Sequence, residues 1–263
     1  MFCANNSYNE PEVIATRKHS MATNTGTIIT LGVLADEQAE RNPKESTRGR
    51  VAGGGKPTTK PLISNGRPLR RYELVNPAQA TEEVSALYAS VPVITLGAIK
   101  GMTIDVEGSE IDTRLLIKDI DSDCLTQPGD IVLSLSAPFA SACIDEQTEG
   151  LFIPNTCAVI RMDSETRKIL DPWFLTGYLN RNIVRRRILE DKATSGAWRT
   201  LRIDDLRTLE IDLPPIDAQE ALGEAIRIDV ENMRRNFAMQ QSREKLVDEA
   251  YAKATALCRK RDA

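Results

Sequence analysis

The sequence predicts an α+β (mixed α/β) globular domain followed by one long C-terminal α-helix. Short apolar runs, separated by turn signals rich in glycine and proline, alternate with a few helical segments up to residue 213. From Asp217 to about Arg259 there is no proline, and the only glycine is Gly223. A single helix is therefore expected over residues 216–263. A length of 263 residues suits one substantial core with such an appendage.

The N-terminal part contains one segment with a regular apolar pattern, between two segments that lack the apolar spacing of a buried helix or strand. Residues 1–26 are polar with no hydrophobic period, so we expect a disordered tail. Residues 27–35 have the pattern of a strand that leads into a short helix. Residues 41–71 are rich in glycine and proline and are interpreted as a long basic loop. Loops of this length in a compact domain are usually functional or disordered.

The remaining elements complete a globular domain over residues 27–215. Asp171 and Pro172 are typical of an N-cap and a first helical position, and the helix they begin should run to about Asp191. A short apolar-spaced turn and a strand over 209–213 lead into Pro214-Pro215. The other expected elements are a short helix within 77–89, a strand at 91–97, a hairpin over 103–118 around Glu107-Gly108, the turn Gln127-Pro-Gly-Asp130 and strands at 131–136, 140–145 and 157–162.

The C-terminal helix has an apolar stripe that predicts pairing with a partner helix as a coiled coil. Five residues spaced 4, 4, 3 and 4 apart form it: Leu222, Ile226, Val230, Met233 and Phe237. A polar break from Gln240 to Lys245 interrupts the stripe. At 1.5 Å per residue the helix would span roughly 65 Å, longer than a small domain covers.

The amino-acid composition favours a soluble protein of a reducing compartment. With 41% hydrophobic and 27% charged residues the chain is ordinary for a soluble protein, and no apolar run approaches the roughly 18 residues of a membrane span. The first 20 residues lack an apolar signal-peptide core. The five cysteines never form a Cys-x-x-Cys pair, which favours a reducing cytoplasm and argues against a zinc site. With His19 as the sole histidine, histidine-based catalysis and multi-histidine metal sites are not expected.

Positive charge is concentrated in one segment, although the net charge of −4 is unusual for a nucleic-acid-binding protein. Residues 41–71 contain nine arginines and lysines and only one acid, Glu45. Such a segment can hold phosphates in an acidic chain; the alternative is a solvated loop. The phosphate candidates are Arg48, Arg50, Lys56, Lys60 and Arg70.

Two further sites are candidates for nucleic-acid contact. The loop Thr194-Ser-Gly-Ala-Trp-Arg199 contains Gly196, which permits close backbone approach beside Ser195, and Arg199, whose fork suits a guanine edge or a phosphate. The alternative is that Trp198 anchors the core and Arg199 is a surface charge. Four arginines near the end of the helix that begins at Pro172 either grip phosphate or complement the helix dipole: Arg181, Arg185, Arg186 and Arg187.

No catalytic or metal-binding residues are predicted. Asp204 and Asp205 are typical of a helix N-terminus. Gly53-Gly-Gly55 lacks the context of a phosphate loop. Leu213-Pro-Pro-Ile216 lacks the amine acceptor and the aromatic ring that amino-methyl transfer to a flipped base requires, so methyl transfer by this chain is rejected.

Several segments together resemble one protein family. The run Ile-x-Leu-Pro-Pro-Ile-x-x-Gln at 211–219 resembles the end of the target-recognition domain in specificity subunits of type I restriction-modification systems. Other segments resemble family strands and a helix in the same order, so that the resemblance extends from about residue 27 to the end. They are Val91–Ile99, Leu125–Ser134 with its Gly-Asp-Ile, Asn155–Arg161 and Asp171–Asn180.

The resemblance implies a non-catalytic subunit in which residues 27–215 read one half-site of double-stranded DNA. The helix would space two recognition domains and dock methyltransferase (M) subunits in a complex that also contains restriction (R) subunits. S-adenosylmethionine, ATP and magnesium would be used by those partners, and no cofactor is expected in this chain. The full family member has two recognition domains and two spacer helices. This chain has one of each, which implies a half-size subunit that forms a homodimer or pairs with another half-size subunit, or else a truncated remnant.

Two other classes of function stay open. A degenerate recognition domain could act as a protein-interaction module that no longer binds DNA, which the acidic net charge favours. A nuclease is the other class, although the carboxylates form no recognisable metal motif.

Overall fold

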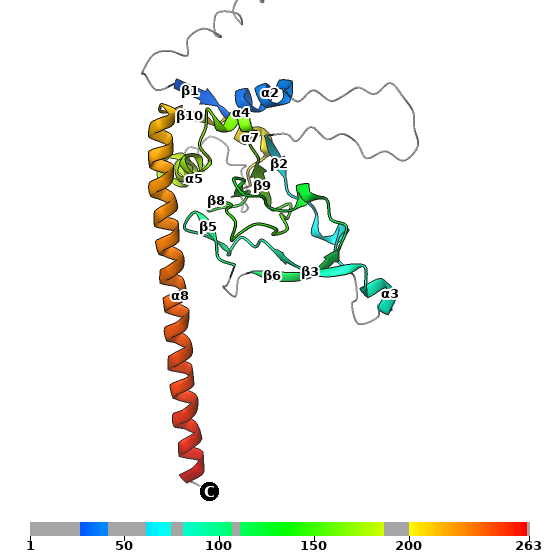
Figure 1. Ribbon diagram of the computed structural model, residues 1–263, viewed down its shortest axis with the longest axis vertical. Helices are drawn as coiled ribbons and strands as arrows, with labels where there is room; N and C mark the ends of the chain where they lie inside the picture. Colours follow the sequence, from blue (N-terminus) through cyan, green and yellow to red (C-terminus); the bar gives the residue numbers. More distant parts are fainter. Residues whose placement is uncertain (1–26, 42–61, 75–80, 107–110, 187–199, 262–263) are drawn as a thin grey trace, which may run out of the picture.

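The structure, a computed structural model, describes residues 27–41, 62–74, 81–106, 111–186 and 200–261. It consists of a mixed α/β domain and one long helix that runs along one side of the domain and projects well beyond it (Figure 1). The predicted fold class is therefore confirmed for the domain and its C-terminal helix.

A four-stranded antiparallel sheet forms the centre of the domain. Its strands lie in the order β2 (Ile63–Asn65), β9 (Cys157–Ile160), β7 (Ile131–Ser134) and β8 (Ser141–Cys143). Ile160 pairs with both Ile63 and Ile131 at one end of β9, and Cys157 pairs with Ser134 at the other. We refer to these as the Ile160 end and the Cys157 end of the sheet. A four-residue strand separates them by about 10 Å.

Both faces of this sheet are covered. Ile131 and Leu133 of β7 belong to one apolar cluster with α2 and α5, while Val132 belongs to a second cluster that includes Ile94 and Ile104. Alternate side chains of a strand point to opposite faces, so one strand contributes to two cores. This explains why β7 and β9 are buried along their whole length and appear in the sequence as continuous apolar runs.

The predicted hairpin over 103–118 is wrong, because its two halves pair with different strands. Strand β5 (Thr103–Ile104) pairs with β4 (Ile99–Lys100) across a turn at Gly101 and Met102, both with positive φ. Strand β6 (Asp112–Ile117) pairs with β3 (Tyr88–Val93), which follows the short helix α3 (Glu82–Ser85). A third apolar cluster, built around Phe152 and Leu116, ties this β3–β6 ribbon to the domain.

The first and last strands of the domain pair with each other. Strand β1 (Thr27–Thr30) leads directly into α2 (Leu31–Arg41), so the predicted strand and helix are confirmed. Strand β1 pairs with β10 (Glu210–Leu213), which follows the short helix α7 (Ile203–Arg207). Both ends of the domain therefore meet where the long helix begins (Figure 1).

The predicted basic loop at 41–71 differs from the structure in its last ten residues. Residues 63–65 form β2 of the central sheet, and residues 69–71 form the short 3-10 helix η2. Leu62 and Ile63 are both buried. Two apolar residues between glycine- and proline-rich stretches are too few to predict a strand. This segment is a strand because its backbone pairs with β9.

The helix expected from Asp171 to Asp191 ends earlier. Asp171 caps α5 (Pro172–Asn180) as predicted, but the backbone of Arg181 is extended, and residues 182–186 are helical again. The break shifts the buried face. Val184 is buried, whereas Ile183 is 54% exposed.

Candidate nucleic-acid interface and helix junction

The Pro-Pro corner joins the domain to α8 (Ile216–Arg261), a helix of 46 residues. Gln219, in the first turn, is 1% exposed. Its Nε2 donates to the carbonyls of Pro214 at 2.8 Å and Ile169 at 3.0 Å, and its Oε1 accepts from the backbone N–H of Asp171 at 3.1 Å. The glutamine of the Ile-x-Leu-Pro-Pro-Ile-x-x-Gln run thus fastens the start of α8 to the start of α5.

A glycine lets the two helices approach closely at this corner. A Cβ at Gly223 would lie 2.2 Å from Oδ1 of Asp171, the oxygen that caps α5 by accepting from the N–H of Phe174. Burial raises the pKa of the Asp171 carboxyl, although hydrogen bonds from the N–H groups of Phe174 and Trp173 act in the opposite direction. Only glycine at 223 therefore preserves the cap without displacing a helix.

The apolar stripe of α8 packs against the chain's own domain over part of its length, where a partner helix was expected to cover it. Val230 is 1% exposed, Ile226 meets Gly177 of α5, and Met233 meets Gly101 of the β4–β5 turn. Phe237 is partly buried and lines a pocket, whereas Leu222 is exposed. The periodicity indicated a packed face, but a sequence pattern does not say which element covers it.

Arg234 adds a polar anchor beside that stripe. Its guanidinium donates to both oxygens of Asp145, at 2.5 and 3.2 Å, and also to Thr103 and Gln147. Burial by itself raises the pKa of Asp145, but the hydrogen bonds and charge of Arg234 outweigh it and hold the pKa below its usual range. Sequence reasoning missed this residue; the available signal was an arginine four positions after Val230, on the packed face.

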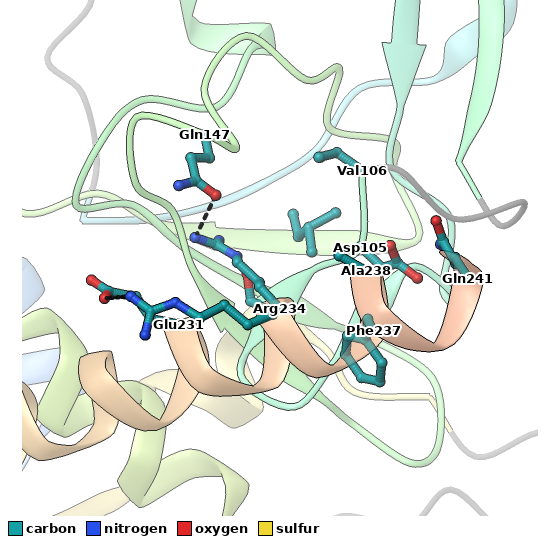
Figure 2. A pocket seen from close by; sticks show the side chains of 11 residues that line it. Asp105, Val106, Gln147, Glu231, Arg234, Phe237, Ala238 and Gln241 are labelled. Atoms are coloured by element: carbon teal, nitrogen blue, oxygen red, sulfur yellow. Dashed lines mark hydrogen bonds and ion pairs between the residues drawn. The ribbon is translucent and has the colours of Figure 1, made fainter. Parts of the chain in front are cut away.

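A pocket of about 450 Å³ lies beside this anchor. Figure 2 shows Arg234 extending from α8 toward Gln147, with Phe237 and Gln241 further along the same helix and Asp105 and Val106 opposite them. The pocket lies where α8 leaves the domain, and its lining mixes apolar and polar side chains.

The outer face of α8 carries three widely spaced large hydrophobic residues, here called the outer stripe, that nothing in the described chain covers. Ile228, Met239 and Leu246 are exposed large hydrophobic residues. At 3.6 residues per turn they lie within about 20° of one another and about 160–180° from Val230. This outer stripe, opposite the domain, is the surface available to a partner helix.

Most of the predicted DNA-contact residues lie outside the described residues. This holds for Arg48, Arg50, Lys56 and Lys60 and for Ser195, Gly196 and Arg199. Described residues that flank these segments lie at opposite ends of the central sheet. The carbonyl of Leu62 accepts from Arg161 N–H, 2.8 Å away, beyond the Ile160 end. Thr200 bridges to Ser136 near the Cys157 end.

Two groups of arginines in the described chain differ in whether they form ion pairs. Seven form ion pairs with carboxylates: Arg41, Arg114, Arg161, Arg207, Arg227, Arg234 and Arg235. By contrast, Arg67, Arg70 and Arg71 are exposed and form no ion pair with any residue that the structure describes. These three arginines, in and beside η2, are therefore candidates for binding phosphate.

Arg185 and Arg186, which follow α5, differ in their exposure to solvent. Arg185 is partly buried and donates to the side chain of Asn180, which in turn binds Ser141 of β8. Arg186 is exposed. Arg185 thus supports the end of α5, and of this predicted pair Arg186 is the one with an accessible guanidinium.

No model of a known protein family matches the chain, and no curated protein sequence matches it. Solved structures do. One is a chain from work described as the structural basis underlying complex assembly and conformational transition of the type I R-M system, with TM-score 0.43 and 15% identity over 91% of this chain and 48% of that chain. The second is the HsdS subunit from Thermoanaerobacter tengcongensis, with TM-score 0.46 and 15% identity over 88% of this chain and 50% of that chain.

These solved chains, an HsdS subunit and a chain from work on a type I R-M system, are of the class that the sequence resembles. At this level of identity the likeness concerns the fold alone, and the chain spans about half the length of the solved chains that it matches. Within the described ranges, no group of three or more His, Cys, Asp or Glu side chains is arranged to hold a metal ion. No helix in those ranges is long and apolar enough to cross a membrane.

Proposed function

We propose that this chain is a non-catalytic DNA-recognition subunit of a type I restriction-modification complex, acting in the cytoplasm. The observation that carries the proposal is the corner at Pro214-Pro215. There a mixed α/β domain passes directly into a helix of 46 residues, locked by the buried Gln219. This is the arrangement that the sequence resemblance to type I specificity subunits implies, and Gln219 gives a physical reason for the motif that carries it.

In this proposal the domain reads one half-site and α8 sets its distance from a second domain. Helix α8 is held to the domain at Gln219, Val230 and Arg234, so the domain has a fixed orientation relative to the helix axis. With a rigid spacer of this kind, the length of the helix sets the distance between two DNA-recognition domains.

The proposed partners are double-stranded DNA, methyltransferase subunits and restriction subunits. The outer stripe of α8, with Ile228, Met239 and Leu246, would pair with a second copy of this chain or another half-size subunit. S-adenosylmethionine, ATP and magnesium would be bound by the partner subunits.

Phosphate contacts are assigned to Arg70 with Arg67 and Arg71, and to the predicted basic residues of 41–61. Base readout is assigned to the segment around Arg199, next to the anchored Thr200. Equilibrium binding of the purified full chain to random-sequence duplexes at several salt concentrations tests the assignment. Binding that weakens as salt rises supports it, and failure to bind DNA at low salt contradicts it.

A second candidate function is a protein-interaction module derived from a recognition domain. Two observations favour it: the net charge of −4 and the uncovered apolar residues on the outer face of α8. It predicts helix-mediated association with the methyltransferase and no DNA binding by the chain or by its complex, which the same binding experiment distinguishes.

A further inference from the structure

Four loops are joined by backbone hydrogen bonds at the Cys157 end of the central sheet. Arg67 N–H donates to the carbonyl of Ile153 at 2.8 Å, and Asn155 N–H donates back to the carbonyl of Arg67 at 3.0 Å. Leu135 N–H donates to the carbonyl of Thr156 at 3.0 Å, and Leu201 N–H donates to the carbonyl of Leu135 at 2.8 Å. We call these loops, residues 65–68, 134–138, 154–157 and 200–202, the sheet-end platform.

Two features make the platform rigid. A Cβ at Gly66 would lie 2.1 Å from the carbonyl oxygen of Pro154, so the first and third loops approach at a distance that only glycine permits. Phe139 is 2% exposed and anchors the chain just after the second loop. A surface held in this way can present side chains in a fixed geometry, as base readout requires.

Apart from Ala137 and Pro138, the exposed side chains of the platform are polar or basic. Arg67, Asn155, Thr156 and Thr200 are all exposed. None of the residues 65–68, 134–138, 154–157 and 200–202 is acidic. Among the described residues, neither Arg67 nor Asn155 uses its side chain in a hydrogen bond or ion pair. The platform therefore offers an amide, that of Asn155, and a guanidinium, that of Arg67, which no described residue of the chain engages.

Resting on the proposed function, we infer that Asn155 reads an adenine in the major groove, in addition to the base readout assigned to Arg199. An asparagine amide matches adenine because its carbonyl accepts from the N6 amino group while its NH₂ donates to N7. Arg67 lies in the neighbouring loop, and its guanidinium suits the adjacent phosphate. The bridge from Ser136 to Thr200 also joins the second and fourth loops of the same platform.

The inference is tested by selecting preferred sequences from a random duplex library with the full chain, its Asn155→Ala variant and an Asn236→Ala control on the exposed side of α8. Circular dichroism and urea unfolding first establish that all three are equally folded. Asn155→Ala should lose preference for adenine at one base-pair position, with discrimination there falling about 5- to 100-fold. The control should select the wild-type sequence.

A salt titration separates base readout from phosphate contact. Asn155→Ala should leave the slope of log K against log salt unchanged. Arg67→Ala should lower that slope by about 0.9 and weaken binding to all sequences alike. An unchanged preferred sequence in Asn155→Ala would overturn the inference while leaving DNA recognition by this chain in place. A uniform loss with a lower slope would overturn it too, because Asn155 would then touch phosphate. If the wild type selects no sequence, both this inference and the proposed function are contradicted.

Discussion

Arg234 of α8 and Asp145 of the turn after β8 form a two-pronged ion pair, at 2.5 and 3.2 Å, that fastens the long helix to its domain. Together with Gln219 and Val230 it lies on one face of the first five turns of α8. Beyond Gln241 the described side chains of the helix are all exposed. The helix thus has a docked half, which fixes the domain, and a projecting half, which is available to partners (Figure 1).

This ion pair should make stability depend on pH in the acid range. The pKa of Asp145 is lowered in the folded protein, so its contribution is present above the unfolded value of about 3.9 and is lost as pH falls through the lower folded value. Asp145→Asn should cost roughly 1.5–3 kcal/mol at pH 7. In urea unfolding at several pH values, the gap between wild type and variant should stay constant from pH 7 to about 5 and shrink below about 4. A gap that does not change down to pH 3 would contradict this account.

The corner at Gln219 should be sensitive to loss of hydrogen bonds rather than loss of volume. Gln219→Met keeps the side-chain length but leaves two carbonyls and one N–H without their partner in a buried place. Because each such group costs about 1–3 kcal/mol, the free energy of unfolding should fall by roughly 3 kcal/mol. The matched control is Gln240→Met, at an exposed position of the same helix, which should change stability by less than about 0.5 kcal/mol. Equal effects for the two variants would mean that the corner is not locked by this residue.

Association of two copies should depend on the outer stripe of α8. Met239→Asp with Leu246→Asp places two charges on that stripe and should give a folded monomer, whereas the wild type should sediment as a dimer. The control Gln240→Asp adds a charge elsewhere on the exposed helix and should leave the dimer intact. Aspartate at Ile226 or Met233, by contrast, should disturb the domain itself, because these residues meet Gly177 and Gly101. A wild type that is monomeric both alone and with a methyltransferase subunit would refute pairing.

Local signals in the sequence predicted the local elements correctly. The Asp-Pro start of α5, the strand and helix at 27–41 and the long proline-free helix each depend on residues close together in the chain, and each is present. The turn at Asp130 was also predicted. Its carboxylate caps the N–H of Gln127, and it also pairs with Arg161 at 2.5 Å, joining two of the segments on which the family resemblance rests.

Long-range relationships could not be predicted in the same way. Strand β2 is too short to have a period of its own and exists because β9 pairs with it. Arg234 and Asp145 are 89 positions apart in the sequence, and no local pattern predicts that they pair. The stripe of α8 was visible, but its spacing suits a helix of the same chain as well as one of a partner. Of the predicted DNA-contact residues, Arg70 and Arg186 are exposed, Arg185 packs on Asn180, and the others lie outside the described residues.

The arginines around η2 should bind phosphate without reading sequence. Arg70→Ala with Arg71→Ala should weaken binding to every duplex and lower the slope of log K against log salt by about 0.9 for each phosphate that is no longer neutralised. Arg227→Ala is the control, because that arginine is already paired with Glu224 and Glu231 on α8. Binding isotherms at four or more salt concentrations measure the slope. A slope unchanged in the double variant would move the phosphate-binding site away from η2, with Arg186 the next candidate.

We propose that this chain directs DNA modification to a defined sequence. The most direct test maps methylated bases across the genome of a host that expresses the chain together with a type I methyltransferase subunit, and of a host that expresses the methyltransferase alone. We predict a single sequence methylated only when the chain is present, composed of two inverted half-sites because two identical domains related by a two-fold axis read the same bases. A methylation map that is the same with and without the chain, although the two proteins co-purify, would contradict the account.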